Sequence, residues 1–520
     1  SIHGWYRRIN GFSKFGSSTP DTTSTNIEGI FRYAKGVVAC QGSNIYYSAD
    51  GNTWTQVNKD TYQNKTGTVS VSAGSPTVTG SGTSFTTEFS VGDDIKINNE
   101  IFNVLSISSN TSLTTDGNFA ATASSQNIKK NGADASQLAS GSTIARTSQS
   151  DCKFALYEGE SQYGELFIVD GNNQPAYLRI DIASGTHTFF FKEVQRSAPE
   201  KSKVATIFSE RLIVAGDSDN PQVLSYSTRL KPESSIFQVS GLDGTAVVSG
   251  VTKNIGCVSG NTVQEIGGDL IFLAPDGLRT IAGTARIDDI ELSSISRKIL
   301  PVFRDEILPF LSSIRFASMV VREKSQYRLF YFRAGVATNI QGGIIGTFKI
   351  SSTGAGVYEW STTKGIPAKI AHAGVDENGS EVLFHASEDG RVYNHDSGNS
   401  FDGSNIVATY KSTDLDYGDA GVRKTLYYIK TSIRSEGVNN NLKLQTRYDF
   451  ESNDVTQPAE IPLGALQTPA TFGSGSTFGT TIFGGTLFPQ QKTTLTGSGF
   501  TNSFRVRSTK KTKWICFRCF

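Results

Sequence analysis

Cysteine and histidine are the residues best suited to metal binding, redox chemistry or proton transfer, and this chain has five of each. Cys516 and Cys519 form a C-x-x-C pair in the run TKWICFRCF, a spacing found in thiol redox centres and zinc sites. A redox centre needs a strand-to-helix context and a zinc site needs a second ligand pair, and the sequence shows neither. We therefore expect both cysteines to lie in a terminal strand.

The other candidate groups are scattered along the chain. The remaining cysteines bring the count to an odd number, which argues against a secreted disulfide framework. The histidines match no metal-ligand spacing, and no G-x-S-x-G, phosphate-binding loop or H-E-x-x-H motif occurs. The sequence therefore predicts no catalytic centre, no metal and no cofactor, and we expect a protein that is not an enzyme. The scattered residues are Cys40, Cys152, Cys257, His3, His187, His372, His385 and His395.

The C-terminal sixty residues contain basic side chains and no Asp or Glu. One interpretation is a solvated face with a loop near residues 508–513. Another is a docking patch for an acidic protein surface, because complementary charge fixes register and speeds encounter. Contact with DNA is a third. The candidate docking residues are Arg505, Arg507, Lys510, Lys511, Lys513 and Arg518.

The overall charge bears on nucleic-acid binding. Lys and Arg number 49 against 48 Asp and Glu, which gives a formal net charge of +1. A protein that binds nucleic acid through counterion release usually has a marked basic excess. The chain as a whole has none.

The composition is typical of many short strands. Hydrophobic residues make up 37% and charged residues 19% of the chain, with 52 Gly and 32 Phe against one Met. Long helices favour Ala, Leu, Glu and Lys, whereas Gly-rich turns favour short strands. The composition therefore predicts an all-β protein. Because a chain of 520 residues is too long to fold around a single hydrophobic core, we expect about two to four domains.

Targeting signals are not evident. No run of eighteen apolar residues occurs, so the sequence predicts no membrane span. The first residues, SIHGWYRRINGF, lack the apolar region of a signal peptide. The sequence also lacks an initiating Met, and we expect either processing or a partial chain.

Residues 67–115 have the strongest strand pattern. Val, Ile and Phe alternate with Ser, Thr and Asn, the period of half-buried strands. Gly-rich breaks, such as Gly80-Ser81-Gly82, supply the backbone freedom that turns need. The pattern predicts a compact module of short antiparallel strands. A small β-barrel inserted in a larger β protein is the simplest interpretation.

Similar apolar strand units recur roughly every forty to fifty residues outside this module, a period that favours the blades of a propeller. Each unit is rich in Ile, Leu, Val and Phe, and several end at an Asp-Gly or Gly-Asp turn. About six units are present. They lie at residues 36–51, 164–171, 210–217, 268–277, 326–332 and 381–393.

Two stretches depart from this pattern. Residues 48–54 (SADGNTW) look like a shortened Asp-box, in which Asp50 would bond the turn while Trp54 packs between strands. Sialidases repeat this box and add an arginine cluster, and neither is found here. Residues 288–310 place apolar side chains at helical spacing around Pro301, which predicts one or two short helices.

Several motifs resemble known phage proteins. T-V-T-G-S-G-T-x-F and V-G-D-x-I in residues 67–115 resemble modules of phage tail structural proteins. L-I-V-A-G, L-I-F-L-A-P-D-G-L-R, D-x-D-Y-G-x-x-G-V-R-K at 414–424, and the F-G-x-x-x-F-G repeats before T-L-T-G-S-G resemble the tail nozzle, or packaged-DNA stabilisation, proteins of short-tailed phages. The terminal WICFRCF departs from the endings expected of that family.

This resemblance implies a virion protein of the phage tail that assembles in the cytoplasm of the bacterial host. Six propeller subunits would form a homohexameric ring below the portal and the tail adaptor protein, extend the DNA channel, retain the packaged genome and anchor tail fibres or spikes. Genomic double-stranded DNA would pass without sequence-specific binding. The alternatives are a propeller glycoside hydrolase, whose carboxylate pair a single sequence would not reveal, and a carbohydrate-binding tail adhesin.

We expect an all-β fold in which a multi-bladed β-propeller of about six blades carries an inserted small β-barrel-like domain and a C-terminal β domain. The expected boundaries are residues 1–65 for the first blade and 66–130 for the inserted domain. Residues 131–405 would form the remaining blades, and residues 406–520 the C-terminal domain.

Overall fold

The computed structural model describes residues 8–519, apart from several internal segments. These segments are residues 24–25, 58–61, 99, 132–149, 160–161, 184–185, 194–200, 220–222, 228, 231–236, 240–255, 282–293, 334–339, 351–355, 437–441, 464–489 and 510–512. The expected Gly/Thr/Phe repeats at 471–485 and the expected loop residues Lys510 and Lys511 lie outside the described residues.

The chain forms two compact units. The larger unit spans Phe15–Val392, and the C-terminal unit combines Ser1–Lys14 with Tyr393–Phe520. Strands dominate both units, as the composition predicts, so the protein is all-β. No helix among the described residues is long and apolar enough to cross a membrane. The finer domain boundaries stay predictions.

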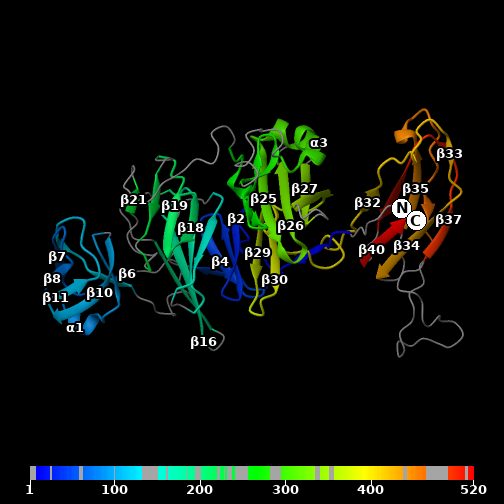
Figure 1. Cartoon of the computed structure of the whole chain (residues 1–520). Coiled ribbons are helices and arrows are strands. Elements are labelled where there is room, and N and C mark those ends of the chain that lie inside the picture. Colours follow the sequence, from blue (N-terminus) through cyan, green and yellow to red (C-terminus); the bar gives the residue numbers. More distant parts are fainter. Residues whose placement is uncertain are drawn as a thin grey trace, which may run out of the picture. The chain divides into compact units, whose positions relative to one another are not determined.

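Six antiparallel sheets repeat along residues 12–395, and strands that are consecutive in the sequence are neighbours in each sheet (Figure 1). Five sheets have four strands and one has three among the described residues. The first three are β2 (Ile27–Tyr33), β3 (Gly36–Gln41), β4 (Asn44–Ser48) and β5 (Thr55–Val57); β14 (Lys153–Tyr157), β15 (Glu165–Val169), β16 (Ala176–Ala183) and β17 (Thr186–Glu193); and β18 (Val204–Phe208), β19 (Arg211–Ala215), β20 (Leu224–Tyr226) and β21 (Phe237–Val239).

The remaining three sheets follow the same plan, with one addition from the start of the chain. They are β22 (Gln264–Ile266), β23 (Asp269–Ala274) and β24 (Gly277–Thr280); β25 (Ile314–Val321), β26 (Gln326–Arg333), β27 (Ile340–Ile350) and β28 (Gly356–Lys364); and β29 (Ile370–Val375), β30 (Glu381–Ala386), β31 (Val392–His395) and β1 (Phe12–Lys14). In the last sheet, β1 pairs with β31 in the register Phe12 to His395. The earliest described strand therefore completes the latest of the six sheets.

Each strand unit identified in the sequence includes the second strand of one of these sheets: β3, β15, β19, β23, β26 or β30. The predicted repeats are thus confirmed as six separate sheets. Second strands are covered on both faces, and β15 and β26 are almost continuously buried. A strand buried on both faces is an apolar run, which is the pattern that the sequence shows most clearly.

The first strands of most consecutive sheets are neighbours. β14 lies beside β18, β22 beside β25, β25 beside β29, and β29 beside β2. The backbone N–H of Cys152 donates to the carbonyl oxygen of Glu28 at 2.9 Å, which joins β14 to β2. The first sheet in the sequence therefore lies next to both the second and the last.

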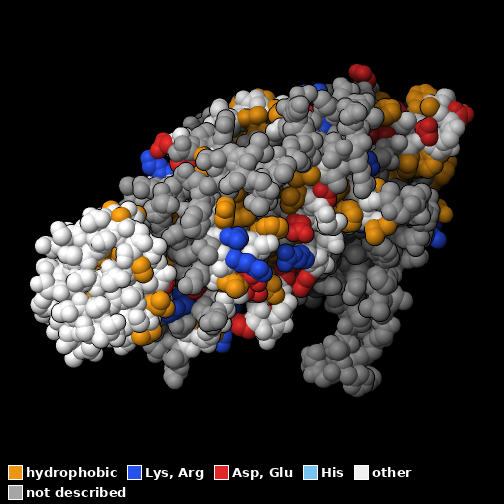
Figure 2. Space-filling model, turned by 60° about the vertical axis from the view of Figure 1, so that its left-hand side comes forward, with side chains coloured by type: hydrophobic (Ala, Val, Ile, Leu, Met, Phe, Trp, Pro, Cys, Tyr) orange, Lys and Arg blue, Asp and Glu red, His pale blue; other side chains and the backbone are white. Residues whose placement is uncertain are grey.

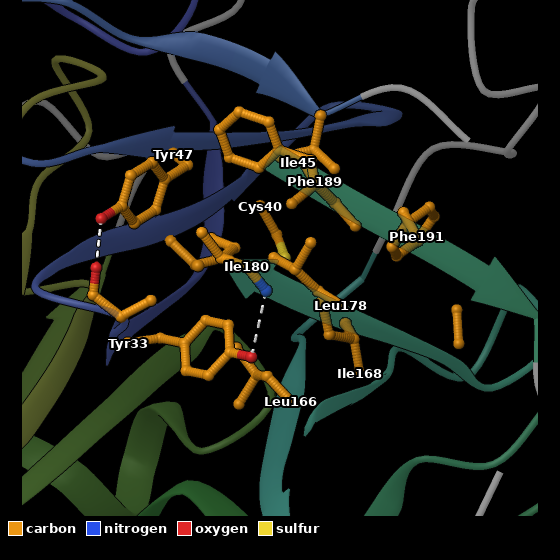
Figure 3. Close-up of a cluster of buried hydrophobic side chains, with 14 of the residues drawn as sticks. Tyr33, Cys40, Ile45, Tyr47, Leu166, Ile168, Leu178, Ile180, Phe189 and Phe191 are labelled. Atoms are coloured by element: carbon orange, nitrogen blue, oxygen red, sulfur yellow. Dashed lines mark hydrogen bonds between the residues drawn. The ribbon is translucent and has the colours of Figure 1, made fainter. Parts of the chain in front are cut away.

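Apolar side chains fill the space between the first two sheets (Figure 3). Cys40 and Ile45 from β3 and β4 pack against Leu166, Leu178 and other buried side chains from β15, β16 and β17. The hydroxyl of Tyr33 accepts a hydrogen bond from the backbone N–H of Ile180 at 3.4 Å, so a polar group also links the two sheets. Burial of this kind is the main stabilising contribution to such a stack.

The shortened Asp-box forms a tight turn after β4. The carboxylate of Asp50 accepts hydrogen bonds from the backbone N–H groups of Asn52 at 2.8 Å and Thr53 at 3.3 Å. Gly51 has φ +75°, and a Cβ there would lie 2.0 Å from the carbonyl oxygen of Phe15. Trp54 packs against the core between the first and last sheets. The turn is structural, as the sequence predicts.

Eight strands between β5 and β14 pair only with one another in the described residues, in the order β12-β7-β8-β11-β10-β9-β13-β6. They are β6 (Tyr62–Asn64), β7 (Thr68–Val71), β8 (Thr77–Ser81), β9 (Asp94–Ile97), β10 (Glu100–Ser109), β11 (Ser112–Thr115), β12 (Ala123–Gln126) and β13 (Lys129–Asn131). A short helix, α1 (Phe85–Glu88), adds Phe85 to their core. The predicted module of short antiparallel strands is confirmed. The face of the module in view is mostly uncharged polar side chains and backbone (Figure 2, left).

The helical spacing around Pro301 is confirmed for residues 297–310, whereas residues 288–293 lie outside the described residues. Short helical turns follow one another as η3 (Arg297–Ile299), α3 (Leu300–Val302), η4 (Phe303–Ile307) and η5 (Leu308–Phe310). Phe303 and Ile307 are fully buried against the core that β23, β25 and β26 also line.

The C-terminal unit has three sheets around its own core of Leu442, Leu444, Phe504, Val506 and others. The largest has the order β32 (Ala408–Lys411), β39 (Asn502–Ser508), β35 (Leu442–Tyr448) and β36 (Ile461–Pro462). The others are β33 (Lys424–Thr425) with β38 (Ser498–Gly499), and β37 (Gln490–Thr494), β34 (Tyr428–Glu436) and β40 (Lys513–Cys519). Cys516 and Cys519 lie in the terminal strand β40, as expected.

Candidate functional site

The structure divides the predicted docking patch between two sheets. β39 carries two of its arginines and β40, in a different sheet, carries two further basic residues. The two remaining lysines lie outside the described residues. The β39 residues are Arg505 and Arg507, the β40 residues are Lys513 and Arg518, and the other two are Lys510 and Lys511.

Alternation along β39 sets the direction of its arginines. Phe504 and Val506 are buried in the core of the C-terminal unit, whereas Arg505 is half-buried and Arg507 is exposed. Because successive side chains of a strand point to opposite faces, both arginines lie on the face away from that core. The structure therefore brings these two predicted residues together.

Neighbouring strands add cations that the sequence analysis missed. Lys411 on β32 lies opposite Arg505, and Lys443 on β35 lies opposite Arg507. Arg447 lies two strand periods beyond Lys443 on the same face of β35. We call these five cations, together with the acidic residues paired with them, the charged face.

Acidic side chains partly neutralise the charged face. Glu451 lies 2.9 Å from Nζ of Lys411 and 3.5 Å from Nη2 of Arg505. Glu460 lies 3.2 Å from Nζ of Lys443 and 3.9 Å from Nη1 of Arg507. The hydrogen bond from Lys411 holds the pKa of Glu451 below its usual value, and the nearby arginines act in the same direction.

The charged face can attract a partner but offers no catalytic arrangement. Side chains of Arg507, Lys443 and Lys411 are 44%, 42% and 40% exposed. Five cations face three carboxylates, since Asp414 also pairs with Lys411 at 3.9 Å. The excess positive charge is open to solvent, where it can steer and orient an acidic surface.

A second set of charges lies at the starts of first strands in the larger unit. Glu28 on β2 and Lys369, just before β29, have side chains only 6% and 2% exposed, with Nζ and Oε1 separated by 3.7 Å. Arg315 on β25 lies 3.6 Å from the other carboxylate oxygen of Glu28. Asn26 accepts a hydrogen bond from Lys369 and donates one to Glu28. We call these residues and the three described next the first-strand cluster.

The same cluster continues into β14 and the turn before β22. The ammonium of Lys153 donates to the amide oxygen of Asn261, whose amide nitrogen donates to Asp151 at 2.8 Å. Burial lowers the pKa of Lys153, against an opposing effect of Asp151. Burial also lowers the pKa of Lys369, against an opposing effect of Glu28. No local pattern in the sequence indicates this cluster, because Asn26 and Lys369 are 343 positions apart.

The arrangement of the first-strand cluster favours a structural role. Both carboxylate oxygens of Glu28 have a cationic or amide partner, and the side chain is almost completely covered. A glycosidase acid or nucleophile must reach its substrate. Glu28 instead holds together residues from the β2, β25 and β29 sheets.

Two histidines of the last of the six sheets lie against its core, His385 fully buried and His372 half-buried. Burial lowers the pKa of His372 to about 4 and that of His385 to about 3, so both rings are neutral near pH 7. The ring of His372 packs against Phe31 with centroids 4.4 Å apart. Among the described residues, no group of three or more His, Cys, Asp or Glu side chains could hold a metal ion.

Comparisons with known proteins identify no family. No family model and no curated protein matches the chain. Among solved structures, the chain is similar to the exo-β-1,3-galactanase of Phanerochaete chrysosporium in crystals with β-1,3-galactotriose or with galactose. Identity is 9% in both, coverage is 99% of this chain and 100% of that chain, and the TM-scores are 0.17 and 0.16. Similarity at this level establishes neither a shared fold nor a shared activity.

Proposed function

We propose that the chain is a non-enzymatic structural protein of a short-tailed phage virion, built on a six-bladed β-propeller that assembles into a tail nozzle ring. The single observation that carries the propeller is the series of six sheets in which the first sheet lies beside the last. Pairing of β1 with β31 would then close the propeller by joining the two ends of the blade series.

The step from propeller to nozzle rests on the order of motifs that resemble the nozzle family. The D-x-D-Y-G-x-x-G-V-R-K segment and the T-L-T-G-S-G segment come together in the C-terminal unit, where β33 pairs with β38. In this proposal six subunits form a ring that extends the DNA channel below the portal and adaptor, and carries fibres or spikes. Double-stranded DNA passes through without sequence-specific contacts.

The distribution of charge is consistent with a conduit. Among the described residues on the face in view, Lys and Arg side chains lie close to Asp and Glu (Figure 2), and the formal net charge of the whole chain is only +1. A channel lined by dense phosphate contacts would hold DNA by counterion release instead of letting it slide. We therefore expect a channel wall of mixed or negative sign.

The native mass of the purified protein, with class-average images, tests this proposal. We expect a closed ring of six copies and no turnover of bacterial surface polysaccharides. A strictly monomeric protein in assembled tails, or glycan hydrolysis at enzymatic rates, would contradict it and favour the propeller hydrolase.

The docking patch has its own test in reconstituted tails. Reversal of Lys510, Lys511 and Lys513 to Glu should block attachment of the ring while leaving its fold intact. A matched control reverses Lys35, Lys298 and Lys364, three exposed lysines of the larger unit, and changes the net charge equally. Normal attachment of the first triple variant would show that the patch is only solvated surface.

A further inference from the structure

One end of the C-terminal unit presents aromatic side chains to solvent. Tyr417, Phe450 and Phe500 are 55%, 73% and 45% exposed. They come from three segments that the fold holds together. The carboxylate of Asp449 accepts hydrogen bonds from the backbone N–H groups of Phe500 at 2.6 Å and Thr501 at 3.0 Å. We call Tyr417, Phe450, Phe500 and their turns the aromatic loop end.

The backbone at the aromatic loop end is strained. Tyr417 has φ +55°, and three consecutive residues, Asp449, Phe450 and Glu451, have φ of +50°, +56° and +62°. A left-handed conformation costs a non-glycine residue on the order of 1–2 kcal/mol, and aromatic residues rarely adopt it. Strain of this kind concentrates at sites where the structure must hold a side chain in a required position.

Hydrogen bonds fix these turns in place. Nζ of Lys424 donates to the carbonyl oxygen of Phe500 at 3.1 Å. The guanidinium of Arg423 donates to the hydroxyl of Ser498 at 2.9 Å and to its carbonyl oxygen at 3.3 Å. The exposed rings therefore stand on a preorganised support, and little conformational entropy remains to be lost on binding.

Exposed aspartates lie beside the rings of the aromatic loop end. Asp416 and Asp419 are exposed, and each uses one carboxylate oxygen to accept from a turn N–H, at 3.0 Å from Gly418 and 2.8 Å from Gly421. Arg423, which is also exposed, donates to the hydroxyl and the carbonyl oxygen of Ser498, and Lys424 donates to the carbonyl oxygen of Phe500. Aromatic rings surrounded by exposed aspartates fit a basic protein surface.

We propose that the aromatic loop end docks on the charged face of a second copy of this chain, an inference that rests on the proposed ring. The charged face has the complementary sign, with an excess of exposed Lys443 and Arg507 over its carboxylates. The anchoring rings of one surface and the cations of the other are different residues, so one copy can use its aromatic loop end while its charged face receives another copy, which is a head-to-tail contact. Contacts of this type generate rings when the rotation closes.

Each half of the contact has a distinct role. Buried aromatic side chains supply most of the affinity in protein interfaces, so Phe450 and Phe500 act as anchors. The ionic groups at the margin set orientation and association rate, so they make assembly sensitive to salt.

Sedimentation velocity of two double variants tests the proposal. Phe450→Ser with Phe500→Ser removes the anchors, and Lys443→Glu with Arg507→Glu reverses the charged face. We expect each variant to be monomeric where the wild-type chain forms rings, with association weakened at least 100-fold. An equimolar mixture should form heterodimers and no larger species, because each variant keeps one intact surface.

Two further variants separate docking from folding. Asp416→Asn with Asp419→Asn keeps the acceptors of both turns and removes only charge, and should weaken association about 10-fold with a smaller salt dependence. Phe208→Ser, at a ring that is 68% exposed in the larger unit, is the matched control and should assemble normally.

The outcomes distinguish the two proposals. If the wild-type chain forms rings and either double variant forms them equally well, or the mixture stays monomeric, docking of these two surfaces is wrong while the ring stands. If the wild-type chain never assembles, the nozzle proposal fails and this contact fails with it.

Discussion

The first-strand cluster and the charged face contain the same kinds of side chain in opposite surroundings. In the cluster, the side chains of Lys369 and Glu28 are 2% and 6% exposed. On the charged face, those of Lys443 and Arg507 are 42% and 44% exposed. Exposed ion pairs contribute little to stability because water and salt screen them. Burial therefore makes the cluster a structural device and leaves the charged face available for binding.

The largest expected effect comes from breaking the buried pair. Glu28→Leu leaves Lys369 charged and almost completely covered, and we expect it to lower the free energy of unfolding of the larger unit by about 3–5 kcal/mol. Urea unfolding followed by tryptophan fluorescence measures this change, because Trp54 and Trp360 lie in that unit.

The double variant Glu28→Leu with Lys369→Met is the control for this experiment. Removing both charges should recover most of the loss, because two apolar groups need no ionic partner. A cost below about 1 kcal/mol for Glu28→Leu would show that water reaches Lys369, and the distinction between the two regions would then disappear.

The second expected effect is a loss of stability of the larger unit in acid that arises from its two histidines with lowered pKa values. The pKa of His372 is lowered to about 4 by burial, against an unfolded value near 6.5. Between these pH values the unfolded chain binds a proton that the folded chain does not. The contribution of His372 to stability should therefore be constant above about pH 6.5 and fall by about 1.4 kcal/mol per pH unit toward pH 4. His385, whose pKa is lowered to about 3, should add an equal slope over the same range and continue the decline toward pH 3.

His372→Phe isolates this contribution. The substitution keeps an aromatic ring against Phe31 and removes one titrating group, so the slope of stability against pH should decrease by one proton. Urea midpoints measured from pH 7.5 to 4.5 provide the comparison. An unchanged slope would mean that His372 is protonated in the folded chain. Strands β32 to β40 contain no His. In these strands and their loops, the ionised carboxylate of Glu451 stabilises the fold, and because its pKa is lowered this stabilisation is lost only at still lower pH.

The sequence predicted those parts of the fold that have a strong local pattern. The second strands are continuous apolar runs because both faces are covered, and β15, β19, β23 and β26 were found for this reason. First strands were missed where they alternate or carry charge, as in β18 with Val204 and Phe208 exposed. In the sheet of β22, β23 and β24, the sequence pattern identified only the region of β23. The strand β22 was missed because it has only the three residues QEI.

The candidate sites were less predictable because they depend on pairing between distant segments. Arg505 and Arg507 were identified from an excess of basic residues, but Lys411 and Lys443 join them only through the registers of β32 and β35. The acidic residues that partly neutralise this face come before the C-terminal stretch that lacks Asp and Glu. The composition of that stretch therefore predicted a patch that is more basic than the folded surface. Glu451 is one of them.

A smaller effect is expected from removing the inserted strands. The core of these strands uses residues 69–128 alone, and Asn64 pairs with Lys129 where they leave and rejoin the larger unit. Replacing residues 65–128 by two glycines should change the stability of the six sheets by less than about 1 kcal/mol, because loop length has a weak entropic effect. The 3–5 kcal/mol loss from Glu28→Leu should persist in this background. Loss of the cooperative unfolding transition would show that the six sheets depend on the insertion.

The smallest effect is expected on the charged face itself. A double-mutant cycle of Lys443→Gln and Glu460→Gln should give a coupling energy of about 0.2–1 kcal/mol, which falls further in 1 M salt, where the screening length is about 3 Å. The exposed pair Lys349 and Glu359, with N and O 2.6 Å apart on β27 and β28, is the matched control and should behave alike. A coupling above about 2 kcal/mol that resists salt would mean that Glu460 is held as firmly as Glu28. The charged face would then have to break strong internal pairs before it could bind any acidic partner, and exposure alone would no longer explain why the two regions differ.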